Sequence, residues 1–513
     1  MTGSGATGQS RHRLTPFGCR WEEGEGRWEK GTVPLTYLIP AYVFSSFGRL
    51  AQPVRARVSD ARGRKARRPT CSRVRAGRIL YTLPDSLPRP SISPWRWIPT
   101  LYFSQGLPYV VVMTVAVVLY KNLGISNTDI ALYTSWLYLP WVIKPLWSPL
   151  VDLLGAKRHW TVALQFTVGA TLAMVALVLP APHFLQLTLA VFWLMAFASA
   201  THDIAADGFY LLALPPHAQA AFVGVRSTFY RLAMIAGQGG LVYLAGRLQE
   251  RTGQVVTAWV AVFSLLAAVF VAAAVYHLWA LPRPAGDRAA PRSQTFWADF
   301  AAVFVAFFRQ PGIGSILAFL LLYRFAEAQL LKLVTPFLLD PRAAGGLGLK
   351  TQDVGIAYGT VGVSALVLGG LLGGWVNARA GLKQVLWPLM VCMHLPNLVF
   401  VALAVWQPVS LPLVSAAIAL EQFGYGFGFT AYLVYMLMVA AGPDGGNPHK
   451  TAHYALCTGF MAMGMMLPGM WAGWLQERLG YVNFFVWACI ATLPSFAAAA
   501  LIRIDPGFGR KTA

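Results

Sequence analysis

The sequence predicts an all-α membrane protein with twelve transmembrane helices in two six-helix halves. Hydrophobic residues make up 56% of the 513 residues and charged residues only 12%, against about 25% charged residues in an average soluble domain. Apolar segments of about 20 residues, the length that crosses a bilayer, recur from Trp95 onward. A connector at 282–311 divides these segments into two groups of six.

The composition excludes a soluble protein of ordinary design. A soluble chain of this length must keep a polar outer shell, whereas a bilayer accepts the apolar surface that water would reject. The 18 Trp and 19 Tyr residues fit this interpretation, because such side chains anchor helix ends at both membrane interfaces.

The first 96 residues differ in kind from the rest. They carry 18 Lys/Arg against 6 Asp/Glu, a net charge of +12 out of +21 for the chain. We expect a basic, disordered tail; the alternative is a wrongly extended reading frame, with translation starting near Ser91. No nucleic-acid-binding motif accompanies the basic residues, so no nucleic-acid partner is expected.

The predicted spans follow in order from this tail. The N-terminal half covers 97–281, the connector 282–311, the C-terminal half 312–505 and a short tail 506–513. Within the connector, Phe296–Phe308 suggests an interfacial helix. The spans are 98–121, 128–150, 160–180, 184–205, 219–246, 255–281, 312–338, 353–378, 384–406, 410–441, 451–475 and 481–503.

The orientation follows from the basic residues between the spans. With both termini in the cytoplasm, the cytoplasmic connections and the C-terminus hold twelve Lys/Arg and the opposite side holds six. Cytoplasmic loops of membrane proteins carry the excess of Lys and Arg. We therefore predict a multi-pass membrane protein with both termini in the cytoplasm.

Charges inside the second span are the first candidates for function. Pro140, Pro145 and Pro149 interrupt its hydrogen bonds and expose carbonyl groups beside Lys144. Lys144 either meets an anionic substrate or neutralises a carboxylate of a neighbouring helix. At the end of this span, Asp152 precedes Gly155, Lys157 and Arg158, an arrangement that can hold a cytoplasmic gate closed; in the second half, Asn377 takes the place of the acid.

The fourth span carries Asp203 and Asp207, whose i,i+4 spacing puts them on one helix face. Two acids in an apolar setting repel each other and lose solvation, so one of them could bind a proton near neutral pH. The pair is therefore a candidate for proton coupling. The alternative is a structural ion-pair network with Arg226 or Arg231 on the fifth span.

The second half has its own intramembrane charges. Arg324 and Glu327 are spaced i,i+3 and could neutralise each other. Glu421 precedes three glycines, and without a partner it would be neutral. Placing a charged side chain within a membrane span costs free energy, and such residues usually have a function. These residues are therefore further candidates for binding substrate, for proton coupling or for gating.

Other chemistry has no support in the sequence. No catalytic triad, zinc-protease motif, P-loop or dinucleotide-binding motif is present, and the five cysteines have no metal-binding or CxxC spacing. We predict no catalytic residue, no metal and no cofactor, and ATP hydrolysis by this chain is not expected.

Six segments within residues 97–505 carry a family resemblance: Phe103-Ser-Gln-Gly-Leu-Pro108, Lys144-Pro-Leu-Trp-Ser-Pro-Leu-Val-Asp152, Ala200-Thr-His-Asp-Ile-Ala-Ala-Asp207, Tyr230-Arg-Leu, Tyr323-Arg-Phe-Ala-Glu-Ala and Glu421-Gln-Phe-Gly-Tyr-Gly-Phe-Gly. They resemble the AmpG-type muropeptide permeases and the related acetyl-coenzyme A transporters of the major facilitator superfamily. The sequence departs from the family at His202, Arg324 and Lys332 and in a longer loop at Gly442–Pro448.

The resemblance implies a proton-coupled importer of anhydro-muropeptides in the bacterial inner (cytoplasmic) membrane, which serves cell-wall recycling. We expect it to act as a monomer. Lys144, Arg231, Arg324 and Gln105 are then the substrate-binding candidates. Asp203, Asp207, Glu327, Glu421 and Asp152 are the candidates for proton coupling or gating. The alternatives are a transporter of another organic anion, a sugar or a coenzyme A derivative, and a membrane-embedded transferase.

Overall fold

The computed structural model of the chain describes residues 19–21, 28–30, 92–289, 296–442, 447, 449–506 and 508. The chain divides into two compact units, Met1–Ile39 and Pro40–Ala513. In the first unit, strands β1 (Cys19–Trp21) and β2 (Trp28–Lys30) pair antiparallel, with Trp21 opposite Trp28. The rest of the predicted basic tail, up to residue 91, lies outside the described residues.

The second unit is helical throughout residues 92–506 as far as they are described. The first set of helices, called the N-terminal set below, ends at Ala280. It contains η1 (Pro94–Arg96), α1 (Ile98–Val110), η2 (Val111–Val115), α2 (Ala116–Asn122), α3 (Asn127–Trp136), α4 (Leu139–Leu154), α5 (Lys157–Val178), α6 (Phe184–Ala213), α7 (Pro216–Ile235), η3 (Ala236–Leu241), α8 (Val242–Thr252) and α9 (Val255–Ala280).

The second set, called the C-terminal set, follows the connector helix α10 (Phe296–Phe308). It contains α11 (Ile313–Leu322), α12 (Phe325–Leu339), η4 (Arg342–Ala344), α13 (Thr351–Val354), η5 (Gly355–Gly362), α14 (Val363–Ala380), α15 (Leu382–His394), η6 (Leu395–Asn397), α16 (Leu398–Trp406), α17 (Leu411–Ala441), α18 (Lys450–Met470), α19 (Ala472–Ile490) and α20 (Leu493–Leu501).

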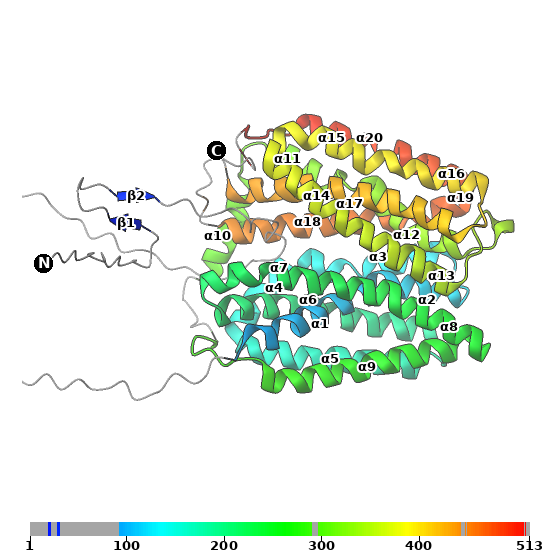
Figure 1. Ribbon diagram of the computed structural model, residues 1–513, viewed down its shortest axis with the longest axis horizontal. Coiled ribbons are helices and arrows are strands. Elements are labelled where there is room, and N and C mark those ends of the chain that lie inside the picture. The colour runs from blue at the N-terminus through cyan, green and yellow to red at the C-terminus, as the bar shows by residue number, and fades with distance from the viewer. Residues whose placement is uncertain are drawn as a thin grey trace, which may run out of the picture. The chain divides into compact units, whose positions relative to one another are not determined.

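The two sets form two neighbouring bundles whose helices run in a common direction (Figure 1). Each bundle has its own apolar core: Phe192, Trp259 and Phe263 are fully buried in the first, and Tyr432 and Phe484 in the second. The connections α2–α3, α8–α9 and α12–α13 lie together at one end, the right-hand end in Figure 1, which we call the distal end.

Among the described residues, eight helices are long and apolar enough to cross a membrane, or nine if α10 with α11–α12 counts as one span bent by 87°. The predicted spans 128–150, 219–246 and 451–475 are also helical, as α3–α4, α7–η3–α8 and α18. α3 and α4 are separate short helices, and α7 carries two arginines, which is why length and hydropathy alone select fewer than twelve spans. The α19 helix is broken at Gly480, whose φ is 73°, next to the predicted start of the last span at 481.

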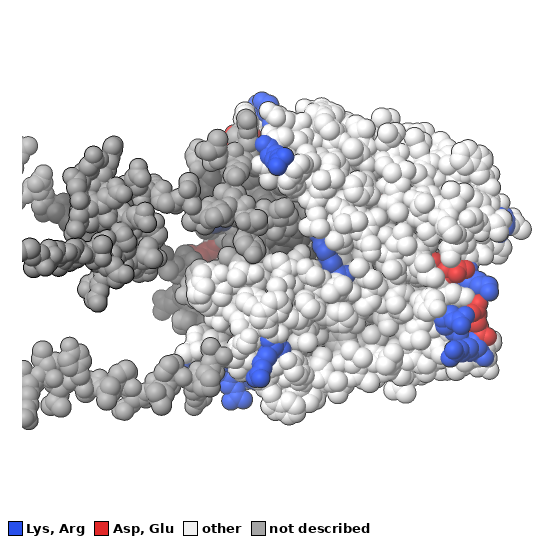
Figure 2. Space-filling view, viewed as in Figure 1, with Lys and Arg blue, Asp and Glu red and all other residues white. Residues whose placement is uncertain are grey.

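The outside of the two bundles is apolar. Leu177, Trp279 and Trp406 are each more than 70% exposed. On the face shown in Figure 2, basic and acidic side chains gather mostly toward the ends of the helices, and the belt between them is almost free of charge. An apolar belt of this kind is typical of a protein surrounded by lipid.

Candidate functional site

Asp203 on α6 faces α4. Trp141 Nε1 donates a hydrogen bond of 3.2 Å to Asp203 Oδ2, and Lys144 Nζ lies 3.6 Å from the same oxygen. Asp203 is 5% exposed, while the Lys144 side chain remains 21% exposed. Of the two roles considered for Lys144, the structure therefore shows the neutralisation of a carboxylate, with part of the lysine still accessible.

Asp207, one turn further along α6, faces α7 and α1. Arg226 Nη2 lies 2.9 Å from Asp207 Oδ1, and the Tyr102 hydroxyl donates to the same oxygen over 3.2 Å. The Arg226 guanidinium also stacks on the Tyr102 ring, 4.5 Å from its centroid. Of the two arginines considered as partners for this acid pair, Arg226 is the one that the fold brings to it.

Arg324 stands alone at the start of α12. It is 8% exposed, hydrogen-bonds to the Tyr425 hydroxyl and lies 4.9 Å from the Phe429 ring centroid. Among the described residues no carboxylate oxygen lies within 4.0 Å of it. The i,i+3 pairing of Arg324 with Glu327 that the sequence allowed is therefore not a direct ion pair.

Glu327 and Glu421 are completely buried. Neither carboxylate oxygen of Glu327 has a hydrogen-bond partner among the described residues, and Glu421 accepts one bond of 2.9 Å, from Gln422. The two carboxyl groups lie within electrostatic range of each other. The sequence showed only one pair of acids, in the first half; the fold creates a second pair from α12 and α17.

Hydrogen bonds between the end of α11 and α17 explain this second pair. The Tyr323 hydroxyl donates to the carbonyl of Gly428 over 2.9 Å, and the Tyr432 hydroxyl donates to the carbonyl of Leu320 over 2.6 Å. These bonds fix the end of α11 against α17, so the first turn of α12 begins beside α17. This placement brings Glu327 within electrostatic range of Glu421.

Lys332 on α12 reaches across to the N-terminal set. Its Nζ donates to Thr134 Oγ1 over 2.9 Å and lies 5.2 Å from the Tyr138 ring centroid. Tyr138 and Tyr109, both from the N-terminal set, also lie within electrostatic range of Arg324. The charged residues of α12 are thus at the boundary between the two sets.

The remaining candidates are Gln105, Arg231 and Asp152. Gln105 on α1 is 1% exposed and lies within hydrogen-bonding range of Asp203 and Asp207, while its Oε1 has no hydrogen-bond partner among the described residues. Arg231 on α7 is half-buried and faces α14 of the other set, because its Nη2 lies 3.9 Å from where a β-carbon on Gly370 would be. Asp152 belongs to α4, and its side chain lies outside the described residues.

An acid that the sequence analysis did not select does cap the start of α5. Asp287, in the connector, accepts hydrogen bonds from the backbone N–H groups of Lys157 over 2.7 Å and Arg158 over 3.0 Å. The Arg158 side chain in turn donates to the carbonyls of Leu278 and Leu281 at the end of α9. The acid expected in this place was Asp152, in the loop itself. Asp287 could not be identified from the sequence, because it lies far away along the chain, in the connector.

His202 belongs to a separate buried chain of polar groups. Gln165 Nε2 lies 3.1 Å from His202 Nε2, and Gln165 Oε1 lies 2.8 Å from His277 Nδ1. His277 Nε2 is 2.9 Å from Thr100 Oγ1. This chain links α6, α5, α9 and α1.

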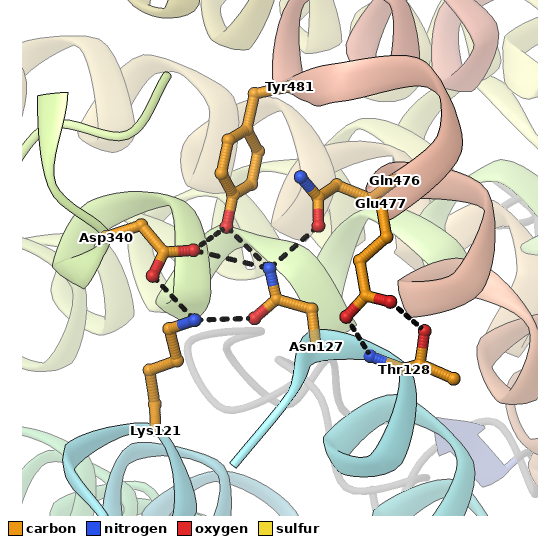
Figure 3. A network of polar contacts seen from close by, with 7 residues as sticks. All are labelled: Lys121, Asn127, Thr128, Asp340, Gln476, Glu477 and Tyr481. Atoms are coloured by element: carbon orange, nitrogen blue, oxygen red, sulfur yellow. Dashed lines mark hydrogen bonds and ion pairs between the residues drawn. The ribbon is translucent and has the colours of Figure 1, made fainter. Parts of the chain in front are cut away.

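The distal end is closed by polar contacts between the two sets (Figure 3). Lys121 Nζ lies 2.6 Å from Asp340 Oδ1, and Asn127 Nδ2 donates to Gln476 over 2.7 Å and to Tyr481 over 2.9 Å. The Tyr481 hydroxyl donates to Asp340 over 2.5 Å. We call Lys121, Asn127, Asp340, Gln476 and Tyr481 the distal network.

A second contact at this end joins α8 to α13. Glu250 accepts hydrogen bonds of 2.8 Å from Lys350 and 2.6 Å from Gln352. These bonds lower the pKa of Glu250, and the Glu250 carboxylate raises the pKa of Lys350. A β-carbon on Gly246 would lie 2.3 Å from the Gln352 nitrogen, so the helices meet here without space between their backbones.

No group of three His, Cys, Asp or Glu within the described part of the chain is placed to hold a metal ion. A surface cavity of about 460 Å³ between α4, α5 and α6 is lined almost entirely by apolar side chains, including Trp147, Trp160 and Phe197. None of the charged candidates lines it.

Comparison with known proteins gives consistent relatives. The profile of the Major Facilitator Superfamily matches residues 100–447. The anhydromuropeptide permease of Escherichia coli strain K12 is 25% identical over 415 residues, which cover 79% of this chain and 78% of the relative. The protein of the same name from Escherichia coli O157:H7 matches to the same extent.

Two solved structures share the fold. A bacterial homolog of the human lysosomal transporter Spinster, inward-facing and unoccupied, has a TM-score of 0.59 at 16% identity, covering 80% of this chain and 96% of that one. The nucleoside transporter NupG has a TM-score of 0.57 at 16% identity, covering 80% and 98%. The resemblance to AmpG-type permeases that the motifs predicted is confirmed by the sequence relatives.

Proposed function

Because this chain belongs to the Major Facilitator Superfamily, we propose that it is a proton-coupled importer of anhydromuropeptides. Like its relatives, it is a multi-pass membrane transporter and not an enzyme. The proposed substrate is the one for which the Escherichia coli relatives, anhydromuropeptide permeases, are named. Transport of another organic anion, a sugar or a coenzyme A derivative is the alternative that the experiment below tests.

The proposed topology has twelve crossings, six in each helix set. The spans outside the eight apolar helices are α3–α4, α7–η3–α8, α11–α12 and α18, each interrupted or polar where it faces the other set. We place both termini in the cytoplasm of a bacterium and the distal end on the outer side of the inner membrane. The connector helix α10, turned by 87° from α11–α12, then lies along the inner interface.

Transport would proceed by rocking of the two sets around the buried charges at their boundary. The distal network and the Glu250 contact close the outer side in this structure, which corresponds to a state in which substrate is released inward. A gradient supplies about 2.3 kcal/mol per charge per 100 mV, enough to accumulate substrate appreciably.

The observation that carries the substrate class is the buried guanidinium of Arg324, which has no carboxylate within 4.0 Å in the described structure. Glu327 acts on this guanidinium only at longer range. A buried charge without a directly paired counter-charge is costly, and an anionic ligand that binds it directly would lower that cost. Lys144 and Arg231, both partly accessible, are the other cations that could meet the carboxylates of a sugar peptide.

The test is uptake of labelled anhydromuropeptide into proteoliposomes with an imposed pH gradient, acid outside. We expect accumulation that a protonophore abolishes. Arg324→Gln should weaken substrate binding about 10–100-fold, the range for a lost hydrogen bond to a charged group. Arg251→Gln, an exposed arginine at the distal end, is the matched control and should transport normally.

Two outcomes of this assay would contradict the proposed substrate. If no uptake occurs with either polarity of the gradient, the muropeptide assignment is wrong. If coenzyme A derivatives or other organic anions are transported while the muropeptide is not, the alternative substrate class replaces it.

A further inference from the structure

The two pairs of buried acids differ in charge balance. In the N-terminal set, Asp203 lies beside Lys144 and Asp207 beside Arg226, so two carboxylates meet two cations. Each acid also accepts a hydrogen bond from an aromatic side chain. This pair is neutral overall without any bound ion.

The C-terminal pair is not balanced. Glu327 and Glu421 interact with each other electrostatically, and within the described part of the chain Arg324 is the cation that acts on Glu327. Three of their four carboxylate oxygens have no hydrogen-bond partner among the described residues. With both acids ionised and Arg324 charged, one negative charge would remain buried, and two adjacent carboxylates without solvent repel each other strongly.

The surroundings of the pair are polar but otherwise uncharged. Tyr358 from η5 and Tyr425 from α17 lie within electrostatic range of both acids, and Gln422 contacts Glu421. On α15, His394 packs against the Tyr323 and Phe496 rings, and its ring nitrogens have no hydrogen-bond partner among the described residues. Among the described residues, no arginine or lysine forms an ion pair with either carboxyl group.

A helix break lies next to Glu421. A β-carbon on Gly428 would meet the Leu389 carbonyl at 2.4 Å, and one on Gly424 would meet the Cys392 carbonyl at 2.3 Å. Continuing this antiparallel register by one turn brings Glu421 level with Asn397, at the end of the break η6. Asn397 is fully buried, and both its amide nitrogen and its oxygen lack partners among the described residues.

We propose that Glu327 and Glu421 together bind one monovalent cation, a proton or a sodium ion, and that this is the site of the coupling ion. One positive charge neutralises the pair with Arg324. When the carboxylate of a substrate binds Arg324, it withdraws the compensation that Arg324 supplies, so the pair then holds its cation more tightly. Substrate and cation would therefore bind together, which is the requirement for symport. This inference rests on the proposed function as an anion importer.

The experiment compares gradient-driven uptake with counterflow in proteoliposomes, for labelled anhydromuropeptide. A gradient of about 60 mV acting on one coupled charge supports about a tenfold accumulation. Glu327→Gln and Glu421→Gln should lose this accumulation, so that the ratio of gradient-driven uptake to counterflow falls about tenfold. Asp207→Asn should keep the wild-type ratio even if less folded protein is recovered, and Asp353→Asn, a carboxyl outside the cluster on α13, is the neutral control.

Two arms distinguish the cations. With a proton, an imposed pH gradient drives uptake and sodium has no effect. With sodium, a sodium gradient drives uptake at equal pH, and Asn397→Leu, which removes an oxygen ligand of the kind sodium prefers, reduces the sodium response. A site that shows neither response in the wild-type protein contradicts the proposal.

A readout without substrate separates this inference from the proposed function. The melting temperature of the purified wild-type chain should rise with sodium or shift with pH, and the rise or shift should disappear in Glu421→Gln. If muropeptide uptake is absent but this response is present, the proposed substrate is wrong and the cation site stands. If Asp203→Asn or Asp207→Asn loses the gradient response while both glutamate variants retain it, the coupling ion belongs to the N-terminal pair instead.

Discussion

Lys121 and Asp340 form an ion pair of 2.6 Å that joins α2 of the N-terminal set to the residue after α12 of the C-terminal set. Both side chains are about 15% exposed, so the pair is neither on the open surface nor in the core. Asn127 and Tyr481 bond to the same carboxylate. Since these partners come from both sets, the network holds the distal end closed.

Asp340→Asn should favour opening of the distal end. The substitution removes the ion pair and weakens the bond from Tyr481, a loss of about 0.5–1.5 kcal/mol per hydrogen bond, or about a two- to tenfold change in the open-to-closed ratio. Spin-label distances between Thr252 and Ala343, at exposed positions of the two sets, should shift toward longer values. An unchanged distance distribution would show that the network does not control the gate. Asp353→Asn serves as the control.

The contact of Glu250 should depend on pH in a definite direction. Hydrogen bonds from Lys350 and Gln352 lower the pKa of Glu250 in the closed state below its ordinary value of about 4.3. A depressed pKa means that the contact stabilises closure above the ordinary pKa and loses this effect as pH falls through the depressed one. Acidifying from pH 7 to about 5.5 should therefore leave it intact, with opening at the same spin labels only below about pH 4.5. Glu250→Gln should remove that acid-induced opening, and retention of the full effect would assign it to other groups.

Gly473→Ala should prevent tight closure of the distal end. A β-carbon at Gly473 in α19 would lie 1.9 Å from the backbone oxygen of Asn127, so the two helices would have to separate. Transport should fall strongly, because the distal end could no longer close. Gly374→Ala, on α14 where a β-carbon meets nothing within 4 Å, should be neutral or stabilising by up to about 1 kcal/mol. Equal transport by both variants would contradict the close packing.

Asp287→Ala should destabilise the N-terminal set. The carboxylate caps the first N–H groups of α5, and loss of such a cap costs about 1 kcal/mol. The melting temperature in detergent should drop by a few degrees, while Asp287→Asn, which keeps an acceptor oxygen, should lose less. A melting temperature that ranks the asparagine variant below the alanine variant would argue against capping.

Much of the fold could be predicted from local sequence. The connector helix was expected at Phe296–Phe308 and forms there, because aromatic periodicity between charged segments is a local signal. The twelve spans were harder to delimit: α3 and α4 form separate helices where one span was expected at 128–150. The AmpG resemblance came from short motifs whose residues are contiguous.

The partners of the charged residues were only partly predictable. Asp203 and Asp207 share a helix face by spacing alone, and Arg226 was one of two arginines considered for them. Glu327 and Glu421 gave no sign of being a pair, because helix register over a long separation brings them together. The distal network was missed for the same reason: Asn127, Gln476 and Tyr481 look like ordinary polar residues at helix ends.

By itself the sequence determined that this chain is a helical transporter that spans a membrane. The length of each apolar segment and the charged residues inside it are local features, so they can be recognised without knowing how the helices pack. Only the tertiary structure decided which charges compensate one another. It pairs both acids of α6 with cations, leaves Glu327 and Glu421 with one arginine between them, and closes the distal end through Lys121 and Asp340. Electrostatic balance depends on distances between helices, and these arise only when the two sets pack together.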